Sequence, residues 1–223
     1  MENKIIRILV VDDHSIIRDG IQQIINRSDE MRICATAADA DGAVKSLNEN
    51  EIDLSIVDIN LKGTVSGIDL IKSMRERFPS VKILVLSMHD ESIYGERSIK
   101  AGADGYIMKE VASLYLLEAI RSIMNGELYI SNGLQKQIIG KLARGNSGTG
   151  DLGVESLTDR EFEVFQLVGN GFSAKEIAGR LHIAMNTVDS HRNRIKEKLK
   201  LESSSDLVKY AIQWVISKSR LQN

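Results

Sequence analysis

The chain has 223 residues, of which 43% are hydrophobic and 27% are charged, a composition typical of globular proteins and not of disordered ones. Its single cysteine, Cys34, excludes an intrachain disulfide. The apolar run near the N-terminus is short and meets acidic residues at once, which excludes a signal peptide and a membrane span. We therefore expect a cytoplasmic protein with no membrane partner.

The net charge of −2 hides an asymmetry along the chain. Residues 1–125 contain 15 Lys and Arg against 20 Asp and Glu, a net charge of −5. Residues 156–223 contain 11 against 8, a net charge of +3. An acidic first part and a basic last part indicate separate tasks, and the basic part is suited to binding a polyanion.

In chain order, residues 1–125 alternate between strand and helix patterns. Continuous runs of β-branched residues, as at 5–11, are typical of strands buried on both faces. The predicted strands are 5–11, 32–37, 54–58, 82–87 and 106–108, and the predicted helices are 16–25, 40–47, 68–78, 93–101 and 114–124. This alternation predicts an α/β domain with a parallel sheet covered by helices on both faces.

Residues 126–155 are predicted to form a linker between two domains. A helix is predicted at 132–142, and the Gly- and Ser-rich segment RGNSGTGDLG follows at 144–153. A phosphate-binding loop is the alternative for this segment. It follows no predicted strand and lacks the Lys-Ser/Thr ending of such loops, so the linker interpretation is favoured.

Residues 156–223 are predicted to form a small all-α domain. Thr158 and Glu161 have the spacing of a capping box, and the helix that they begin stops at Gly169-Asn170-Gly171. Further helices are predicted at 174–181, 187–199 and 207–216. Two helices joined by a tight turn, the second of them basic, are typical of a helix-turn-helix that docks in the major groove.

Polar residues follow the strands of the predicted sheet at one edge. Asp12-Asp13, Asp58, Ser87 and Lys109 stand at the carboxyl ends of four different strands, where functional groups gather in parallel sheets. Three carboxylates at one edge repel each other unless a hard divalent cation pairs with them. A lysine opposite them could then pair with a phosphoryl oxygen.

Residues 5–125 resemble a response-regulator receiver domain, which implies a flavodoxin-like fold. The resemblance rests on VVDDHS at 10–15, IVDIN at 56–60, LSMHD at 86–90 and AGADGYIMKE at 101–110. It implies that Asp58 accepts a phosphoryl group from a sensor histidine kinase. It also implies an Mg²⁺ site formed by Asp12, Asp13, Asp58 and the backbone carbonyl of Asn60.

The same resemblance implies roles for the remaining polar residues of this edge. Lys109 contacts the phosphoryl group, Ser87 donates a hydrogen bond to it, and Tyr106 moves with Ser87 as the switch aromatic. Asn60 and His89 occupy the positions that tune hydrolysis of the phosphoryl group. The loop at 61–67 departs from the family pattern, because it has no proline and is slightly longer, and Lys62 lies in it.

Residues 157–201 resemble the DNA-binding domain of the LuxR/NarL/FixJ family, through LTDREFEV, GFSAKEIAGRL and NTVDSHRNRIKEKL. The resemblance makes 187–199 the recognition helix. It implies that Asp189, Ser190 and Asn193 face the edges of bases. It also implies that DNA phosphates are contacted by Lys175, His191, Arg192, Arg194 and Lys196. Many members have Lys where this chain has Asp189. An acid cannot bind phosphate but could accept a hydrogen bond from cytosine.

The last predicted helix pairs with its twin in DNA-bound dimers of the family. The resemblance therefore implies dimer contacts by Leu207, Ala211 and Trp214. The alternative is that these residues only complete the core of the small domain.

Together these features predict a DNA-binding response regulator and not an enzyme. Its expected partners are a sensor histidine kinase, promoter DNA, RNA polymerase and a second copy of the chain. A phosphatase that uses Asp58 as nucleophile would need an acid two residues further on, where Asn60 stands. A phosphorylation-independent DNA binder with a degenerate receiver is a third possibility, which the intact set of polar residues disfavours.

Overall fold

We describe the protein from a computed structural model, in which residues 5–61, 65–143 and 153–219 are placed well enough to be described. The chain divides into two compact units between Arg144 and Gly145. Each unit is described by itself. No helix among the described residues is long and apolar enough to cross a membrane.

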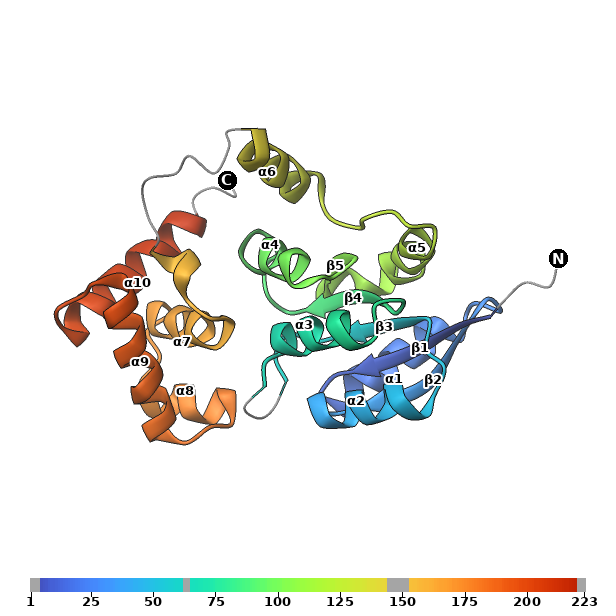
Figure 1. Cartoon of the computed structure of the whole chain (residues 1–223), viewed down its shortest axis with the longest axis horizontal. Coiled ribbons are helices and arrows are strands. Elements are labelled where there is room, and N and C mark those ends of the chain that lie inside the picture. The colour runs from blue at the N-terminus through green and yellow to red at the C-terminus, as the bar shows by residue number, and fades with distance from the viewer. Residues whose placement is uncertain (1–4, 62–64, 144–152, 220–223) are drawn as a thin grey trace. The chain divides into compact units, whose positions relative to one another are not determined.

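The first unit is built on a five-stranded parallel sheet with the order β2-β1-β3-β4-β5 (Figure 1). Its strands are β1 (Ile6–Val11), β2 (Met31–Ala37), β3 (Leu54–Val57), β4 (Lys82–Ser87) and β5 (Gly105–Met108). Its helices are α1 (Ser15–Ile25), α2 (Ala40–Glu49), α3 (Gly67–Arg77), α4 (Glu91–Ala101) and α5 (Ala112–Met124), with a 3₁₀ turn, η1, at Lys109–Val111. The prediction of a flavodoxin-like α/β domain is confirmed.

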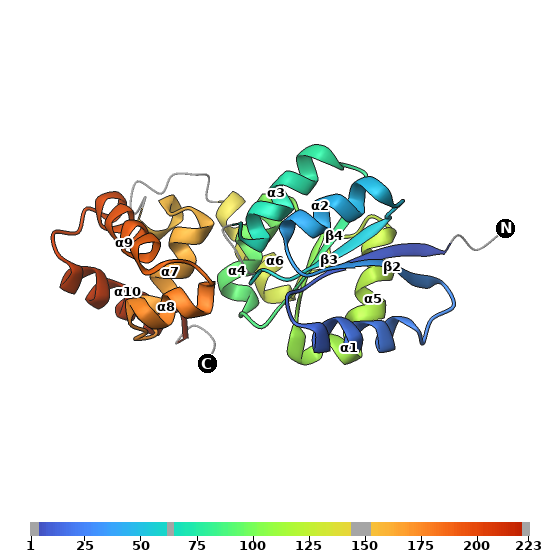
Figure 2. The ribbon, with the colours of Figure 1, turned by 90° about the horizontal axis from the view of Figure 1, so that it is seen from below.

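Helices cover both faces of this sheet. Figure 2 shows α1 and α5 on one side and α2 and α3 on the other. Ile8 and Val10 of β1 pack with Ile21 of α1 and Leu116 of α5 in one buried cluster. Because side chains alternate along a strand, Leu9 and Val11 point to the opposite face, and both are also buried. This explains why the strands are continuous apolar runs without a polar alternation.

Local signals set the ends of several helices. The side chains of Asp39, Ser66 and Asp90 cap α2, α3 and α4 by accepting hydrogen bonds from backbone N–H groups of the first turn. Gly102 ends α4 in the left-handed conformation, with φ 111°. The predicted boundaries agree with the observed ones to within a few residues, and β3 ends one residue before Asp58.

The first unit extends beyond residue 125, where the sequence had placed the start of the linker. The backbone of Tyr129 pairs with the edge of β5, since its carbonyl accepts from the N–H of Tyr106 and its own N–H donates to Asp104. Helix α6 (Asn132–Ala143) then packs on α4, where Leu134 lies against Gly95. The Gly-rich segment predicted as linker, 144–153, lies almost entirely outside the described residues.

The second unit consists of helices. They are α7 (Asp159–Gly169), α8 (Ala174–Leu181), α9 (Met185–Leu199) and α10 (Ser204–Ser219), preceded by a 3₁₀ turn, η2, at Val154–Ser156. Thr158 and Glu161 form the predicted capping box at the start of α7. Ser173 and Glu176 form a second one on α8. The predicted all-α domain is confirmed, with α9 two residues longer at its start and α10 longer at both ends.

Candidate functional sites

Four polar residues meet at the carboxyl edge of the sheet because the strands are parallel. Asp12 follows β1, Asp58 follows β3, Ser87 ends β4 and Lys109 follows β5. The Asp12, Asp58 and Ser87 residues are buried, with exposed fractions of 1%, 3% and 0%. The sheet topology thus brings together residues that lie up to 97 positions apart in the sequence.

Lys109 lies between two of these carboxylates. Its Nζ is 2.6 Å from Oδ2 of Asp58 and 2.6 Å from Oδ2 of Asp12. Burial lowers the pKa of Lys109, but the charges and hydrogen bonds of Asp58 and Asp12 outweigh this effect and raise its pKa overall. The lysine therefore stays charged between the two carboxylates.

The surroundings of Asp58 make its carboxyl group a weaker acid than usual. Burial, with the nearby charge of Asp12, raises the pKa of Asp58 from 3.8 to about 6, although Lys109 and the N–H of Asn60 act in the opposite direction. The N–H of Asn60 donates to Oδ1 of Asp58 over 3.2 Å. At neutral pH the group is mostly ionised, but its charge is poorly compensated by protein atoms alone.

Four residues at this edge could hold a metal ion together. One ligand atom from each of Asp12, Asp13, His14 and Asp58 lies within 4.8 Å of the others. Nδ1 of His14 is 2.7 Å from Oδ1 of Asp13, and its backbone N–H donates to Asp12 over 2.8 Å. Carboxylate oxygens are the ligands that a hard divalent cation prefers. The sequence prediction missed His14, whose only signal is its position directly after the acidic pair.

His89, in the loop after β4, contacts the end of β4, strand β5 and helix α4. Its backbone N–H donates to Oγ of Ser87 over 3.1 Å, and its carbonyl accepts from the hydroxyl of Tyr106 over 2.7 Å. Its ring lies 4.5 Å from the ring of Tyr94, a contact that the sequence prediction missed. Burial raises the pKa of Tyr106, so its hydroxyl remains a donor.

The imidazole of His89 is also paired with Asn60. Burial, with the charge of Lys109, lowers the pKa of His89 to about 4, so the ring is neutral at physiological pH. Nδ2 of Asn60 lies 2.7 Å from Nε2 of His89, and a neutral ring can accept this hydrogen bond. The two residues predicted to tune hydrolysis therefore touch each other beside Asp58.

The chain returns close to Asp58 at Gly67, the first residue of α3. A Cβ atom at Gly67 would lie 2.1 Å from the carbonyl oxygen of Asp58 and 2.6 Å from Cα of Ile59. Only glycine fits this approach, in which the N–H of Gly67 donates to the carbonyl of Ile59. Of the loop at 61–67, Lys62 and its two following neighbours lie outside the described residues.

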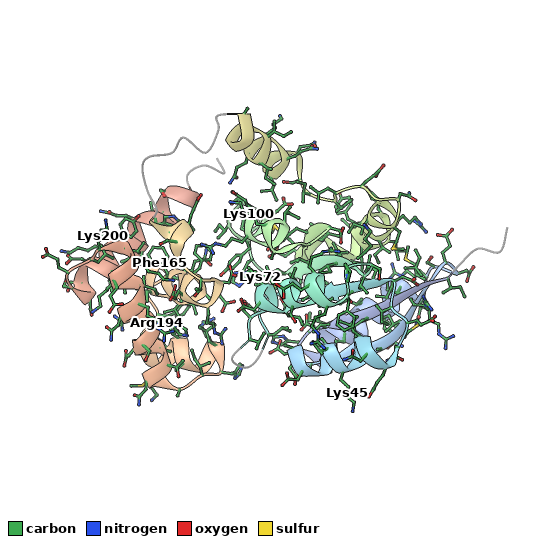
Figure 3. All side chains as sticks on the ribbon, viewed as in Figure 1. Lys45, Lys72, Lys100, Phe165, Arg194 and Lys200 are labelled. Carbon is green, nitrogen blue, oxygen red and sulfur yellow. The ribbon has the colours of Figure 1, made fainter. Side chains whose placement is uncertain are left out.

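In the second unit, α9 presents a polar surface. Val188 and Ile195, one heptad apart, are fully buried and orient the helix, so that residues on its other side face outward. Among the predicted contact residues, Lys175 of α8 and Asp189, Ser190, Asn193 and Arg194 of α9 are exposed, whereas His191, Arg192 and Lys196 are partly buried. Figure 3 marks Arg194 on this helix. The hydroxyl of Ser190 donates to the carbonyl of Asn186.

Not every cation of α9 is free for a ligand. Nζ of Lys198 lies 2.6 Å from Oε2 of Glu161 and ties α9 to the capping box of α7. This contact and the hydrogen bond from Thr158, against the effect of burial, lower the pKa of Glu161. Lys200 ends the helix in the left-handed conformation, with φ 56°. The side chain of Lys198 therefore has a structural role, whereas Lys200 contributes through its backbone.

Two of the three residues predicted to form the dimer contact are buried inside the second unit. Leu207 and Ala211 of α10 are fully buried, and Gly169 of α7 approaches the backbone of Ala211. Trp214 is partly buried, with its ring 5.4 Å from that of Phe162 and 5.7 Å from that of Phe165. Within one chain, Leu207 and Ala211 thus belong to the core of the unit, and dimer contact by Trp214 stays a prediction. Helical periodicity alone could not tell this face from the exposed one.

Comparison with known families finds one match for each unit of the chain. The family described as response regulator receiver domain matches residues 8–121, and the family described as bacterial regulatory proteins, luxR family, matches residues 155–211. The chain is a response regulator with a LuxR-type DNA-binding domain. This response regulator is 33% identical over 212 residues to the oxygen regulatory protein NreC of Staphylococcus epidermidis, with 93% of this chain and 97% of NreC covered.

Solved structures of similar proteins have the same fold. The RcsB response regulator of Salmonella typhimurium matches with a TM-score of 0.65 and 23% identity, over 94% of this response regulator and 98% of RcsB. A LuxR-family two-component response regulator of Aurantimonas sp. matches with a TM-score of 0.57 and 31% identity, over 63% of this chain and 99% of that one.

Proposed function

We propose that this response regulator is phosphorylated on Asp58 by a sensor histidine kinase and that phosphorylation controls its binding to promoter DNA. The observation that carries the proposal is the position of Lys109, whose Nζ lies 2.6 Å from both Asp58 and Asp12. This arrangement supplies a nucleophile and a fixed cation at one buried edge. Phosphoryl transfer requires mainly positioning and charge neutralisation of this kind.

In the proposed transfer, a carboxylate oxygen of Asp58 attacks the phosphorus of a phosphohistidine on the kinase. The P–N bond breaks, and the imidazole nitrogen leaves with the electron pair. Lys109, which now forms an ion pair with Asp58, then pairs with a phosphoryl oxygen. The product is an acyl phosphate on Asp58, so the chain acts as acceptor and slow hydrolase of its own phosphoryl group, and not as an enzyme on other substrates.

Mg²⁺ fits the donor set at this site. The carboxylates of Asp12, Asp13 and Asp58 and the carbonyl of Asn60 would hold it, and when bound it supplies the positive charge that three carboxylates and an incoming phosphoryl group require. The raised pKa of Asp58 supports this assignment, because Lys109 alone does not compensate the buried charge. His14 contributes by orienting Asp12 and Asp13.

The readout of phosphorylation is proposed to run through the loop after β4. Ser87, which accepts from the N–H of His89, would donate its hydroxyl hydrogen to the phosphoryl group. His89 also accepts from Tyr106, so a shift of this loop reaches the switch aromatic directly. The contact between Asn60 and His89 beside Asp58 would restrict access of water to the acyl phosphate.

The output is proposed to be DNA binding by α9 in the major groove, followed by contact with RNA polymerase. RcsB has been solved as dimers bound to DNA. A dimer of this chain would place two copies of α9 on two half-sites. Since Leu207 and Ala211 are buried, the exposed Ile212 and Ile216 of α10 are the side chains available for a dimer contact. Such a regulator acts in the cytoplasm, where the DNA is.

Two other functions are less consistent with the site. A phosphatase would need a general acid two residues after Asp58, and the residue there is Asn60, whose amide is paired with His89. A receiver indifferent to phosphate has no need for Lys109 to be held between two buried carboxylates.

Treatment with acetyl phosphate and Mg²⁺ tests the proposal. We expect stable labelling of the wild-type chain, tighter DNA binding, and complete loss of both in Asp58→Ala. Asp29→Ala serves as the matched control, because Asp29 is exposed and lies outside the site. Equal stimulation of DNA binding in Asp58→Ala would sink the proposal, and rapid turnover of diverse phosphoesters would favour the phosphatase.

A further inference from the structure

Asp189 is an acidic residue on the surface that is proposed to meet DNA. It lies in the second turn of α9 and is exposed. In the part of the chain that the structure describes, its carboxylate forms no hydrogen bond or ion pair. Its charge is therefore neither neutralised by the domain nor used to stabilise it.

The rotation of α9 limits what Asp189 can reach. Val188, the preceding residue, is fully buried, so Asp189 projects about 100° around the helix axis from the core-facing side. Asn193 lies one turn further along the same flank and is exposed. The hydroxyl of the intervening Ser190 donates a hydrogen bond to the carbonyl of Asn186. Asp189 and Asn193 are thus two exposed hydrogen-bonding side chains on this flank of the helix.

A carboxylate beside DNA is repelled by phosphate and by most of the major groove. The groove offers two donors, the N4 amino group of cytosine and the N6 amino group of adenine. The adenine donor stands between two acceptors, N7 of adenine and O4 of thymine. The cytosine donor stands at the outer edge of its base pair, with one acceptor beside it. A single unpaired carboxylate therefore gains most at cytosine.

We propose that Asp189 selects a cytosine in the major groove at one position of each half-site. The inference rests on the proposed function, because it requires α9 to enter the groove with its N-terminal turns. Asp189 rejects guanine and thymine at that position, since both present acceptors to it. It adds specificity while it lowers the affinity for DNA of every other sequence.

The test is a selection from randomised duplexes with the full-length chain after treatment with acetyl phosphate and Mg²⁺. The selected site is then titrated with each base pair exchanged in turn. For the wild type we expect one position at which cytosine is preferred by about tenfold or more. Asp189→Asn should move this preference to adenine, which pairs with an amide through N6 and N7. Asp189→Lys should move it to guanine.

Glu197→Gln is the matched control. Glu197 is exposed on the same helix two turns further on, and the substitution removes the same charge. It should raise the affinity for all duplexes alike and leave the base preference unchanged. If Asp189→Asn behaves in the same way, Asp189 only repels phosphate and the inference is overturned. If the wild type enriches no sequence, the proposed function itself fails.

Discussion

The charged residues at the edge of the sheet and those on α9 differ in burial and in pairing. At the edge of the sheet, Asp12, Asp58 and Lys109 are buried and already paired with each other. On α9, Asp189, Asn193 and Arg194 are exposed and have no partner among the described residues. The first arrangement concentrates charge where one small group can be placed accurately. The second leaves charge free for a large polyanion.

This difference predicts how each region responds to salt and to pH. Buried charges are weakly screened by salt and respond to protonation, since burial perturbs their pKa. Exposed charges are strongly screened and contribute little to folding. Each prediction below tests one side of this contrast against the other, from the largest expected effect to the smallest.

The salt dependence of the two activities should differ most. In a dimer, we expect four cations on or beside α9 of each chain to neutralise phosphates. Raising the salt concentration from 50 to 200 mM should then weaken DNA binding by about 10³-fold or more. Labelling of Asp58 by acetyl phosphate should change by only a few-fold over the same range. Fluorescence anisotropy and radiolabel incorporation measure the two effects. A flat salt response of DNA binding would contradict the assignment of α9.

Within α10, substitution of a buried apolar residue should lower the stability of the unit, whereas substitution of an exposed one should weaken dimerisation. Leu207→Ala removes a fully buried side chain and should lower the free energy of unfolding of the second unit by about 3 kcal/mol. Ile212→Ala removes a side chain that is 38% exposed and should cost less than about 1 kcal/mol, yet weaken dimerisation. Urea unfolding and sedimentation measure these effects. Equal losses of stability would mean that Ile212 belongs to the core.

Asp58→Asn should stabilise the first unit at neutral pH. The pKa of Asp58 is raised from 3.8 to about 6, so the folded state binds this proton more tightly than the unfolded state, and ionisation costs stability. The gain should be at most about 3 kcal/mol above pH 6, and it should vanish as the pH falls to about 4. Urea unfolding without divalent metal measures it.

The control for this variant is Asp29→Asn, an exposed position at which the stability should change little at any pH. Addition of Mg²⁺ should shrink the advantage of Asp58→Asn, because the metal compensates the charge that the substitution removes. A gain that persists at pH 4 would show that the charge of Asp58 is not its origin.

The smallest effect is expected from a single exposed cation. Arg194→Ala should weaken DNA binding by about 1 kcal/mol for all sequences and reduce the salt slope by about one per lost contact. The stability of the second unit should change by less than about 0.5 kcal/mol. A loss confined to one DNA sequence would instead assign Arg194 to a base edge.

Much of the receiver site could be predicted before any coordinates. Asp12, Asp58, Ser87 and Lys109 each follow an apolar run, and parallel strands bring their carboxyl ends to one edge. Contacts between loops were not predictable in this way. The pairing of Asn60 with His89, and of His89 with Tyr94, depends on loop conformations that no periodicity encodes.

The limits of periodicity are clearest in the helices. The pattern of α10 indicates an apolar face but not what covers it. The structure shows that α10 packs on α7 and α9, that Leu207 and Ala211 are buried, and that Gly169 of α7 lies against Ala211. The pattern of α6 predicts a helix, but only the structure shows that it packs on α4 and that Tyr129 pairs with the edge of β5. The first unit therefore continues past residue 125.

By itself the sequence determined the alternation of strands and helices, the two-domain plan and the set of charged residues that carry the chemistry. These properties follow from local patterns of burial and from the rule that parallel strands share one edge. The tertiary structure decided which charges are buried and paired, as at Lys109, and which are left free, as at Asp189. The reason is physical: burial and pairing depend on neighbours that are distant in the chain, and these set both the pKa of a group and its availability to a ligand.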